Sequence, residues 1–442
     1  MKRERIGLTA IAFAVAFLIV VGAVVSFAED ALVLPKGVFR VNFDGNFYLP
    51  IHKRYNPDGK VEDLAVDFNA SLNSNVFPAL APLDPFVPGL PSIGDSHVDF
   101  EYNVQTLETS LQYGVTDKLT LGVNVPYWWF RNKVKARVDS GVGSSANVGK
   151  NPFFACGSPV CPLAVPGTSR FTTEDVQQLL GKGLDVNGDG LIDIPGFKYK
   201  RFQSFEGNGL SDVEAGLRYQ YFRTADWRLA FTGGVRFPTG RVDDPDNLTD
   251  YAFGTGAYAL LFRFNHDFLV SNLWKKDKIF VENQPAAGAV VEPGDLVLNG
   301  TFRYDLLLPD TQRKRVSSDV NQPITSNSEI VSRNLGDVFE YEISAKYGFL
   351  EGLQASALYK YSFKLRDEIS GNKGFNYKSL EDETEAKSHI IIVGLSYTTL
   401  PLFLQKKFPL PITASLSYRN RVAGSNNVLK SQYIGFALSA LF

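Results

Sequence analysis

Strict alternation of apolar and polar residues recurs along the chain from residue 39 to its end, and it limits the possible folds more than any other feature. In the run 353–366, for example, Tyr359 and Tyr361 alternate with Lys360 and Ser362. A period of two places the two kinds of side chain on opposite faces of a β-strand. The sequence therefore predicts an all-β fold in which many strands have one apolar and one polar face.

The length of these runs and of their connections separates a membrane barrel from a soluble β-sandwich, which would also alternate. The runs cover 11 to 15 residues, which matches a tilted crossing of a bilayer. Tight turns, such as 115–118 and 350–352, alternate with long polar loops, such as 131–209 and 367–386. Short periplasmic turns and long extracellular loops are typical of outer-membrane barrels. We therefore predict a transmembrane antiparallel up-and-down β-barrel with long extracellular loops.

An even strand count is expected of such a barrel, with both termini in the periplasm. The alternating runs predict about 12 strands, near 36–50, 97–114, 118–130, 210–223, 227–238, 252–265, 294–308, 337–348, 353–366, 387–398, 409–422 and 431–442. A count of 14 is the alternative, because 268–282 and 309–336 could hold one further pair.

The beginning of the chain predicts export. Three basic residues among the first five positions precede an unbroken apolar stretch, Ile6–Val25, and Ser26 and Ala28 then place small residues at the two positions that signal peptidase reads. We predict a signal peptide over 1–28, with an uncleaved membrane anchor as the alternative, because the stretch is long enough to span. The remaining residues, 29–442, are then the barrel, with 131–209 as a large extracellular loop.

The end of the chain agrees with this prediction. Ile434, Phe436, Leu438, Ala440 and Phe442 place an apolar side chain at every second position and an aromatic residue at the carboxy-terminus. This pattern resembles the signal by which the barrel-assembly machinery recognises its clients. We therefore expect the bacterial outer membrane as the location, with its lipid and the assembly machinery as partners.

Composition excludes two other classes of protein. The 45 Lys and Arg residues are balanced by 47 Asp and Glu residues, so the formal charge of −2 gives no electrostatic footprint for nucleic acid. After residue 28 no run approaches the roughly 20 apolar residues that a spanning helix needs. We therefore expect neither a nucleic-acid-binding protein nor a helical membrane protein.

Three segments carry a resemblance to a known family, namely Ser110–Trp129, Gly207–Phe222 and Leu229–Arg241. They resemble the outer-membrane transporters associated with the meta-pathway of phenol degradation, a family similar to the fatty-acid-transporter superfamily of barrels. The resemblance implies uptake or passage of small aromatic or hydrophobic compounds. It carries over no substrate-binding residue.

Charged residues on the polar faces of the predicted strands are candidates for lining the lumen. They are Arg218, Arg228, Arg236, Arg303, Lys360, Lys364, Arg366 and Arg419, facing Asp212, Glu214, Glu340 and Glu342. These residues could line a narrow pore or form ion pairs across it, and the sequence leaves both interpretations open.

One segment of the large loop has the spacing of a calcium-binding loop. Oxygen-bearing side chains stand at Asp185, Asn187, Asp189 and Asp193, with the carbonyl of Leu191 at the seventh position. Alternate residues of such a loop point inward to Ca²⁺, and the glycine at its sixth position permits the sharp bend. The twelfth position is glycine instead of glutamate, as in the short loops of dockerin-type and thrombospondin-type repeats, which this segment resembles. A metal-free turn is the alternative.

The only two cysteines, Cys156 and Cys161, lie in the same loop. In an exported chain a local disulfide is the natural prediction. The single Met and the absence of His and Cys clusters argue against haem or another redox cofactor.

In the segment 57–96 the prolines at positions 78, 82, 85, 88 and 91 alternate with apolar residues, which denies the segment a place as a central strand. An apolar loop exposed to water would be a liability. We predict that it folds into the barrel mouth as a gate or ligand cradle, with packing against neighbouring loops as the alternative.

Three classes of function remain. The first is a passive channel or facilitated transporter for small solutes, with selectivity from the lumen charges and the loops. The second is a barrel whose extracellular loops bind a partner. The third is an outer-membrane hydrolase, which we do not expect, because His52, His97, His266 and His389 stand in no catalytic motif beyond the pair Ser388-His389.

Overall fold

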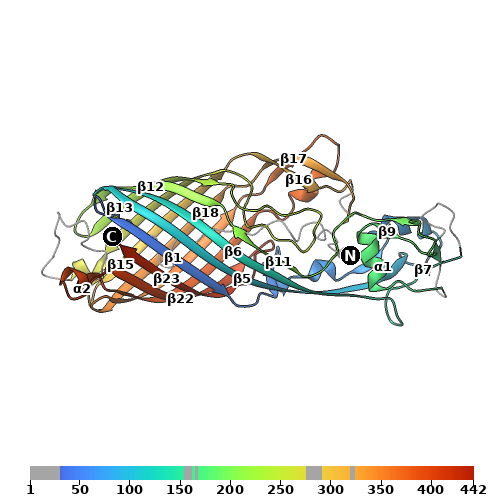
Figure 1. The fold of residues 1–442 in the computed structure, drawn as a ribbon, viewed down its shortest axis with the longest axis horizontal. Helices are drawn as coiled ribbons and strands as arrows, with labels where there is room; N and C mark the ends of the chain where they lie inside the picture. The colour runs from blue at the N-terminus through green and yellow to red at the C-terminus, as the bar shows by residue number, and fades with distance from the viewer. Residues whose placement is uncertain (1–29, 154–161, 165–167, 275–290, 319–323) are drawn as a thin grey trace, which may run out of the picture.

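The predicted strands close into one antiparallel barrel (Figure 1). The structure, a computed structural model, describes residues 30–153, 162–164, 168–274, 291–318 and 324–442. The barrel strands are β1 (Phe39–Tyr48), β5 (Ser92–Thr116), β6 (Leu119–Asp139), β12 (Val213–Arg223), β13 (Trp227–Phe237), β14 (Ala259–Leu269), β15 (Leu296–Leu307), β18 (Val338–Leu350), β19 (Leu353–Lys364), β21 (Ala386–Thr398), β22 (Ile412–Gly424) and β23 (Gln432–Leu441). Each strand pairs with the next in this order, and β23 returns to pair with β1. The prediction of 12 barrel strands is confirmed.

The two ends of the barrel differ. At one end the connections include two-residue turns, such as 117–118 and 351–352, and at the other end the loops are long. The long loops mark the extracellular end and the short turns the periplasmic end. β5 and β6 are the longest strands, with 25 and 21 residues, and their hairpin extends far beyond the others on the extracellular side (Figure 1). Strand pairing therefore continues into both ends of the segment 131–209, since β11 (Phe205–Leu210) also pairs with β6.

Further elements lie mainly outside the membrane. A three-stranded extracellular sheet contains β16 (Asp310–Arg315), β17 (Ser328–Asn334) and β20 (Glu368–Ser370). The described parts of the segment 309–336, proposed above as a source of a further barrel strand, contribute β16 and β17 to this sheet instead. The remaining strands are β2 (Lys53–Tyr55), β3 (Val61–Asp63), β4 (Ser71–Asn73), β7 (Gly149–Lys150), β8 (Leu163–Ala164), β9 (Gly183–Leu184) and β10 (Ile194–Pro195). The helices are α1 (Thr173–Leu180), α2 (Leu400–Leu404) and the 3-10 turns Val66–Phe68, Pro78–Leu83, Val270–Leu273 and Tyr377–Leu380. No helix in the described part of the chain is long and apolar enough to cross a membrane.

The outer surface of the barrel is apolar. Phe43 and Phe47 on β1 and Ile434 and Phe436 on β23 are each about half exposed, whereas the residues between them face inward. Phe442 closes the seam, because its backbone N–H donates to the Phe39 carbonyl at 2.9 Å. A closed barrel leaves no unpaired strand edge, and an apolar exterior suits lipid. The protein is therefore an outer-membrane β-barrel.

The largest apolar core lies in the extracellular part, not in the lumen. Phe68 and Phe77 from the first loop pack there with Phe100 and Phe130 of the extended hairpin and with Phe202. The segment 57–96 thus packs against neighbouring loops and the hairpin.

Candidate functional site

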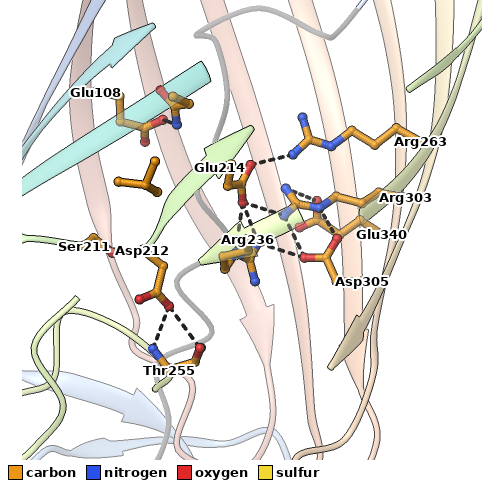
Figure 2. Close-up of polar contacts among 12 residues, drawn as sticks. Glu108, Ser211, Asp212, Glu214, Arg236, Thr255, Arg263, Arg303, Asp305 and Glu340 are labelled. Carbon is orange, nitrogen blue, oxygen red and sulfur yellow. Dashed lines mark hydrogen bonds and ion pairs between the residues drawn. The ribbon is translucent and has the colours of Figure 1, made fainter. Parts of the chain in front are cut away.

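Charged side chains from neighbouring strands meet inside the barrel (Figure 2). The carboxylate of Glu214 on β12 accepts hydrogen bonds from Nε and Nη2 of Arg236 at 3.0 and 2.7 Å. It also accepts from Nη2 of Arg263 at 2.9 Å and from Nη2 of Arg303 at 3.4 Å. Asp305 accepts from both Arg303 and Arg236. Because Glu214 and Arg303 stand on strands separated by two others, these contacts join strands that are not neighbours in the barrel wall.

The same network continues around the wall. Nη1 of Arg303 lies 3.7 Å from Glu340 on β18, and Nζ of Lys360 on β19 lies 2.8 Å from Glu340 and 3.2 Å from Glu342. We call this set the ion-pair belt, and its members are Glu214, Arg236, Arg263, Arg303, Asp305, Glu340, Glu342 and Lys360. Six of these eight residues were predicted from the sequence. Arg263 and Asp305 were missed, although their strands place them on the inward face.

The chain segment before β1 lies inside the periplasmic half of the barrel. The backbone N–H of Ala31, a fully buried residue, donates to both carboxylate oxygens of Asp267 at 3.0 Å. Gln220 donates to the Ala31 carbonyl at 2.7 Å, and the N–H of Leu34 donates to Thr120 at 2.8 Å. These partners stand on β14, β12 and β6, so residues 30–36, the N-terminal segment, occupy the lumen below the belt.

The third extracellular loop, residues 238–258, folds inward above the belt. Asp212 at the start of β12 accepts hydrogen bonds from the backbone N–H groups of Gly240 and Thr255 at 3.0 and 2.8 Å. A Cβ atom on Gly254 would lie 2.2 Å from Oδ1 of Asp212 and 2.8 Å from the Cα of Gly240. Only glycine permits this close approach of the two ends of the loop.

An ion pair and aromatic contacts hold the same loop. Nη1 and Nη2 of Arg241 donate to both oxygens of Asp250 at 2.8 and 2.7 Å. The Arg241 guanidinium lies over the ring of Phe253, with its Cζ 4.9 Å from the centroid. The Tyr251 ring stacks on that of Phe130 with centroids 4.2 Å apart. The inward position of the loop is therefore fixed by contacts at several points.

A cavity of about 160 Å³ lies between this loop, the belt and the extracellular sheet. Its aromatic lining comes from Trp128, Tyr199, Tyr251 and Phe253. Leucine, isoleucine and proline side chains add to this apolar wall, namely Pro126, Pro245, Leu248, Leu335, Ile369 and Leu380. Glu214 and Arg236 of the belt form part of its polar lining. The segment 57–96 supplies no residue to the lining of this cavity.

Tyr199 is one of the lining residues outside the membrane-spanning strands. Burial raises the pKa of its phenol above the usual value, so the side chain is neutral at ordinary pH. The Cζ of Arg315 lies 4.0 Å from the centre of the Tyr199 ring. Sequence reasoning missed Tyr199 and Trp128 as cavity residues, although the alternation along β6 places Trp128 inward and Trp129 outward.

The other predicted lumen residues have local partners. Arg218 donates to Thr232 and to the Asp30 carbonyl, and Arg228 lies 3.7 Å from Asp267. Lys364, buried near the extracellular end of β19, donates to the Thr384 carbonyl at 3.1 Å.

Arg366 is not a lumen residue. It lies beyond the end of β19 in the loop, with its side chain 50% exposed, and pairs with Asp382 at 2.5 Å. Side chains alternate between the lumen and the outer face only while the strand continues, and β19 ends at Lys364. The prediction that Arg366 lines the lumen is therefore wrong.

The predicted calcium loop forms a compact turn. The oxygens of Asp185 accept backbone hydrogen bonds from Gly188 and Gly190, at 2.7 and 2.8 Å. Asp193 accepts from the N–H of Val186 at 2.8 Å. Within the described ranges no group of three or more His, Cys, Asp or Glu residues is placed to hold a metal ion. Hydrogen bonds from backbone N–H groups to the Asp185 and Asp193 carboxylates thus hold the turn in this conformation. Calcium binding stays a prediction.

Two other predictions lie outside the residues that the structure describes. They are the signal peptide 1–28 and the disulfide between Cys156 and Cys161. The pair Ser388-His389 is described, and it stands on β21 with Ser388 inward and buried, whereas Nδ1 of His389 contacts the Tyr359 hydroxyl at 2.6 Å. Adjacent residues of a strand point to opposite faces, so these two side chains cannot act on one substrate.

Comparisons with known proteins found distant likenesses only. No protein-family model and no curated protein matches the chain. An outer membrane channel from Pseudomonas putida F1 is 10% identical, with a TM-score of 0.48 over 94% of this chain and 99% of that chain. A Pseudomonas aeruginosa FadL homologue is 10% identical, with a TM-score of 0.31 over 92% and 90% of the two chains. The Ralstonia pickettii toluene transporter TbuX is 11% identical, with a TM-score of 0.32 over 92% and 90%.

Proposed function

We propose that this barrel is an outer-membrane channel or facilitated transporter for small hydrophobic or aromatic solutes. The observation that carries the proposal is the cavity beneath the inward-folded loop 238–258. Its volume of about 160 Å³ is similar to the roughly 150 Å³ of an apolar protein cavity that binds benzene. Trp128, Tyr251 and Phe253 offer ring faces, on which an aromatic solute can stack.

The geometry also supports a gated route in place of a standing aqueous pore. Three barriers follow one another along the lumen, namely the loop 238–258, the ion-pair belt and the N-terminal segment. A solute that enters the cavity meets the belt next, and the belt is held by buried charge pairs. Passage therefore requires a movement of at least one barrier, and we assign the gating to the loop and the N-terminal segment.

The first test is the conductance of the refolded protein without residues 1–28 in a planar lipid bilayer, with and without phenol. Current steps that phenol alters support a solute route through the lumen. A correctly folded barrel that carries no current and is unaffected by phenol contradicts the proposal, and favours a barrel that acts through its extracellular loops.

Two neighbouring tryptophans supply a matched pair of variants. Trp128 is 5% exposed and lines the cavity, whereas Trp129 is 42% exposed on the outer face. We expect Trp128→Ala to weaken the effect of phenol on the current several-fold and Trp129→Ala to leave it unchanged. Equal effects of the two variants would show that the cavity is not on the route.

A further inference from the structure

Two further cavities lie beside the cavity of about 160 Å³ beneath loop 238–258, which we call the lumen cavity. One is an outer cleft of about 600 Å³ on the extracellular part of the hairpin, lined by residues of β6, α1 and 201–204. The side chain of Arg201 in its lining is 56% exposed, so the cleft opens to water. The other, the middle cavity, has a volume of about 70 Å³ and lies within the largest apolar core.

Shared lining residues place the three cavities next to one another. The outer cleft and the middle cavity have four lining residues in common, namely Ala136, Thr173, Gln177 and Phe202. Leu248, which belongs to loop 238–258, lines both the middle cavity and the lumen cavity. The three cavities therefore follow one another from the outside of the extracellular part to the lumen, with the middle cavity as the narrowest.

The outer cleft lies where the wall of paired strands is interrupted. The pairing of β11 with β6 covers only the six residues of β11 and ends before the outer part of β6. Beyond it, the backbone N–H groups of Val134 and Val138 donate to the hydroxyls of Ser204 and Thr173, each at 3.0 Å. Ala136 lies between these two contacts, and its small side chain leaves the gap open toward the middle cavity.

The middle cavity offers apolar surface and little else. Its wall is mainly aromatic and aliphatic, with side chains such as Phe68, Phe77, Val176, Leu180, Leu248 and Ile324. Its polar side chains already have partners. The Gln177 amide donates to the Phe202 carbonyl at 2.8 Å and accepts from the Phe202 N–H at 2.9 Å, and the Ser96 hydroxyl donates to the Phe68 carbonyl at 2.6 Å. A charged or strongly polar solute would lose its hydration here without gaining comparable hydrogen bonds.

We propose that the outer cleft and the middle cavity form a side entrance through which small neutral apolar solutes reach the lumen cavity. The solute passes Ala136 into the middle cavity and then Leu248 into the lumen cavity. Because an apolar cavity that binds benzene has roughly 150 Å³, the middle cavity must widen as an aromatic ring passes. Leu248 belongs to the loop to which we assign gating, so movement of this loop opens the narrow part. The inference rests on the proposed function, since it adds the entrance and its selective step to that route.

The test measures how fast nitrobenzene, a neutral aromatic probe, quenches tryptophan fluorescence of the refolded protein in detergent after rapid mixing. Trp128 lines the lumen cavity, so the part of the quenching that is lost in Trp128→Phe reports arrival of the probe there. We expect Ala136→Phe to slow this part at least tenfold. Its final extent should stay unchanged, because Ala136 does not line the lumen cavity. Leu248→Ala removes the side chain between the middle and lumen cavities and should speed the quenching at least threefold.

The matched control is Lys135→Phe, because Lys135 is the neighbour of Ala136 on β6 and is exposed on the opposite face. Heat-dependent gel mobility shows whether each variant is folded, and Leu248→Ala decides the question if Ala136→Phe does not fold. An unchanged rate in the deciding variant, or equal slowing in Ala136→Phe and Lys135→Phe, overturns the inference. A current that responds to phenol together with quenching rates that ignore both Ala136→Phe and Leu248→Ala refutes the side entrance alone. The expected rates in a protein that carries no solute refute the channel alone.

Discussion

Glu214 is the residue on which the ion-pair belt depends most, so Glu214→Gln is its most informative variant. Its carboxylate accepts hydrogen bonds from three arginines, and its side chain is 9% exposed. Removing one partner of a buried ion pair costs about 3–5 kcal/mol, because the remaining charge is left in a medium of low dielectric. Glutamine keeps the volume and one acceptor oxygen, so we expect a loss near the lower limit, about 3 kcal/mol.

The assay is unfolding by guanidinium chloride in detergent, followed by the change in gel mobility of the folded barrel. The matched control is Glu206→Gln on β11, whose carboxylate lies 3.9 Å from Arg131 with the two side chains 75% and 55% exposed. A surface pair of this kind contributes about 1 kcal/mol or less, so the control should change little. A loss below about 1 kcal/mol in Glu214→Gln would refute the reasoning that Glu214 compensates the charge of the buried arginines.

Three further predictions concern the barriers on either side of the belt. Deleting residues 29–34 from the mature protein should raise the single-channel conductance in a planar bilayer, because the N-terminal segment then no longer occupies the periplasmic half of the lumen; an unchanged conductance would contradict that role. Asp250→Asn removes the buried partner of Arg241, and the loss of about 1–3 kcal/mol should increase hydrogen exchange in 238–258 roughly fivefold or more, whereas unchanged protection would show that other contacts hold the loop. Burial raises the pKa of Asp246, but the hydrogen bonds and charges of Arg313 and Arg315 together lower it by more. The pKa therefore lies below its usual value of 3.8. The resulting stabilisation is fully present above pH 3.8 and is lost as the pH falls through the lowered pKa, so protection of 238–258 should persist at pH 5 and decrease below pH 3.8; protection already lost at pH 5 would refute this assignment.

The strands of the barrel could be predicted from the sequence because alternation is a local property. Along β19, for example, Tyr359 and Tyr361 point outward, to the side that faces lipid in a membrane barrel. Lys360 lies between them and therefore points inward. Each predicted strand therefore matches an observed one within a few residues at most ends. The exceptions are β5 and β6, which extend to Ser92 and Asp139, and β14, which begins at Ala259 and not near residue 252.

The partners inside the lumen could not be predicted in this way. Alternation tells which face a side chain occupies, but the partner of Glu214 depends on the tilt of the strands and on side-chain reach across the lumen. The position of the N-terminal segment depends on Asp267, which is 236 residues away from Ala31 in the chain. Proline spacing predicted that 57–96 is not a central strand, and this holds for its proline-containing part, whereas residues 92–96 begin β5. The apolar residues of the segment pack against the hairpin of β5 and β6.

The ion-pair belt contains equal numbers of positive and negative side chains. The belt contains the four cations Arg236, Arg263, Arg303 and Lys360, and the four anions Glu214, Asp305, Glu340 and Glu342. Equal numbers in close pairs produce little net field, so the belt cannot by itself favour anionic or cationic solutes. Any preference for the charge of a solute must then come from residues outside the belt.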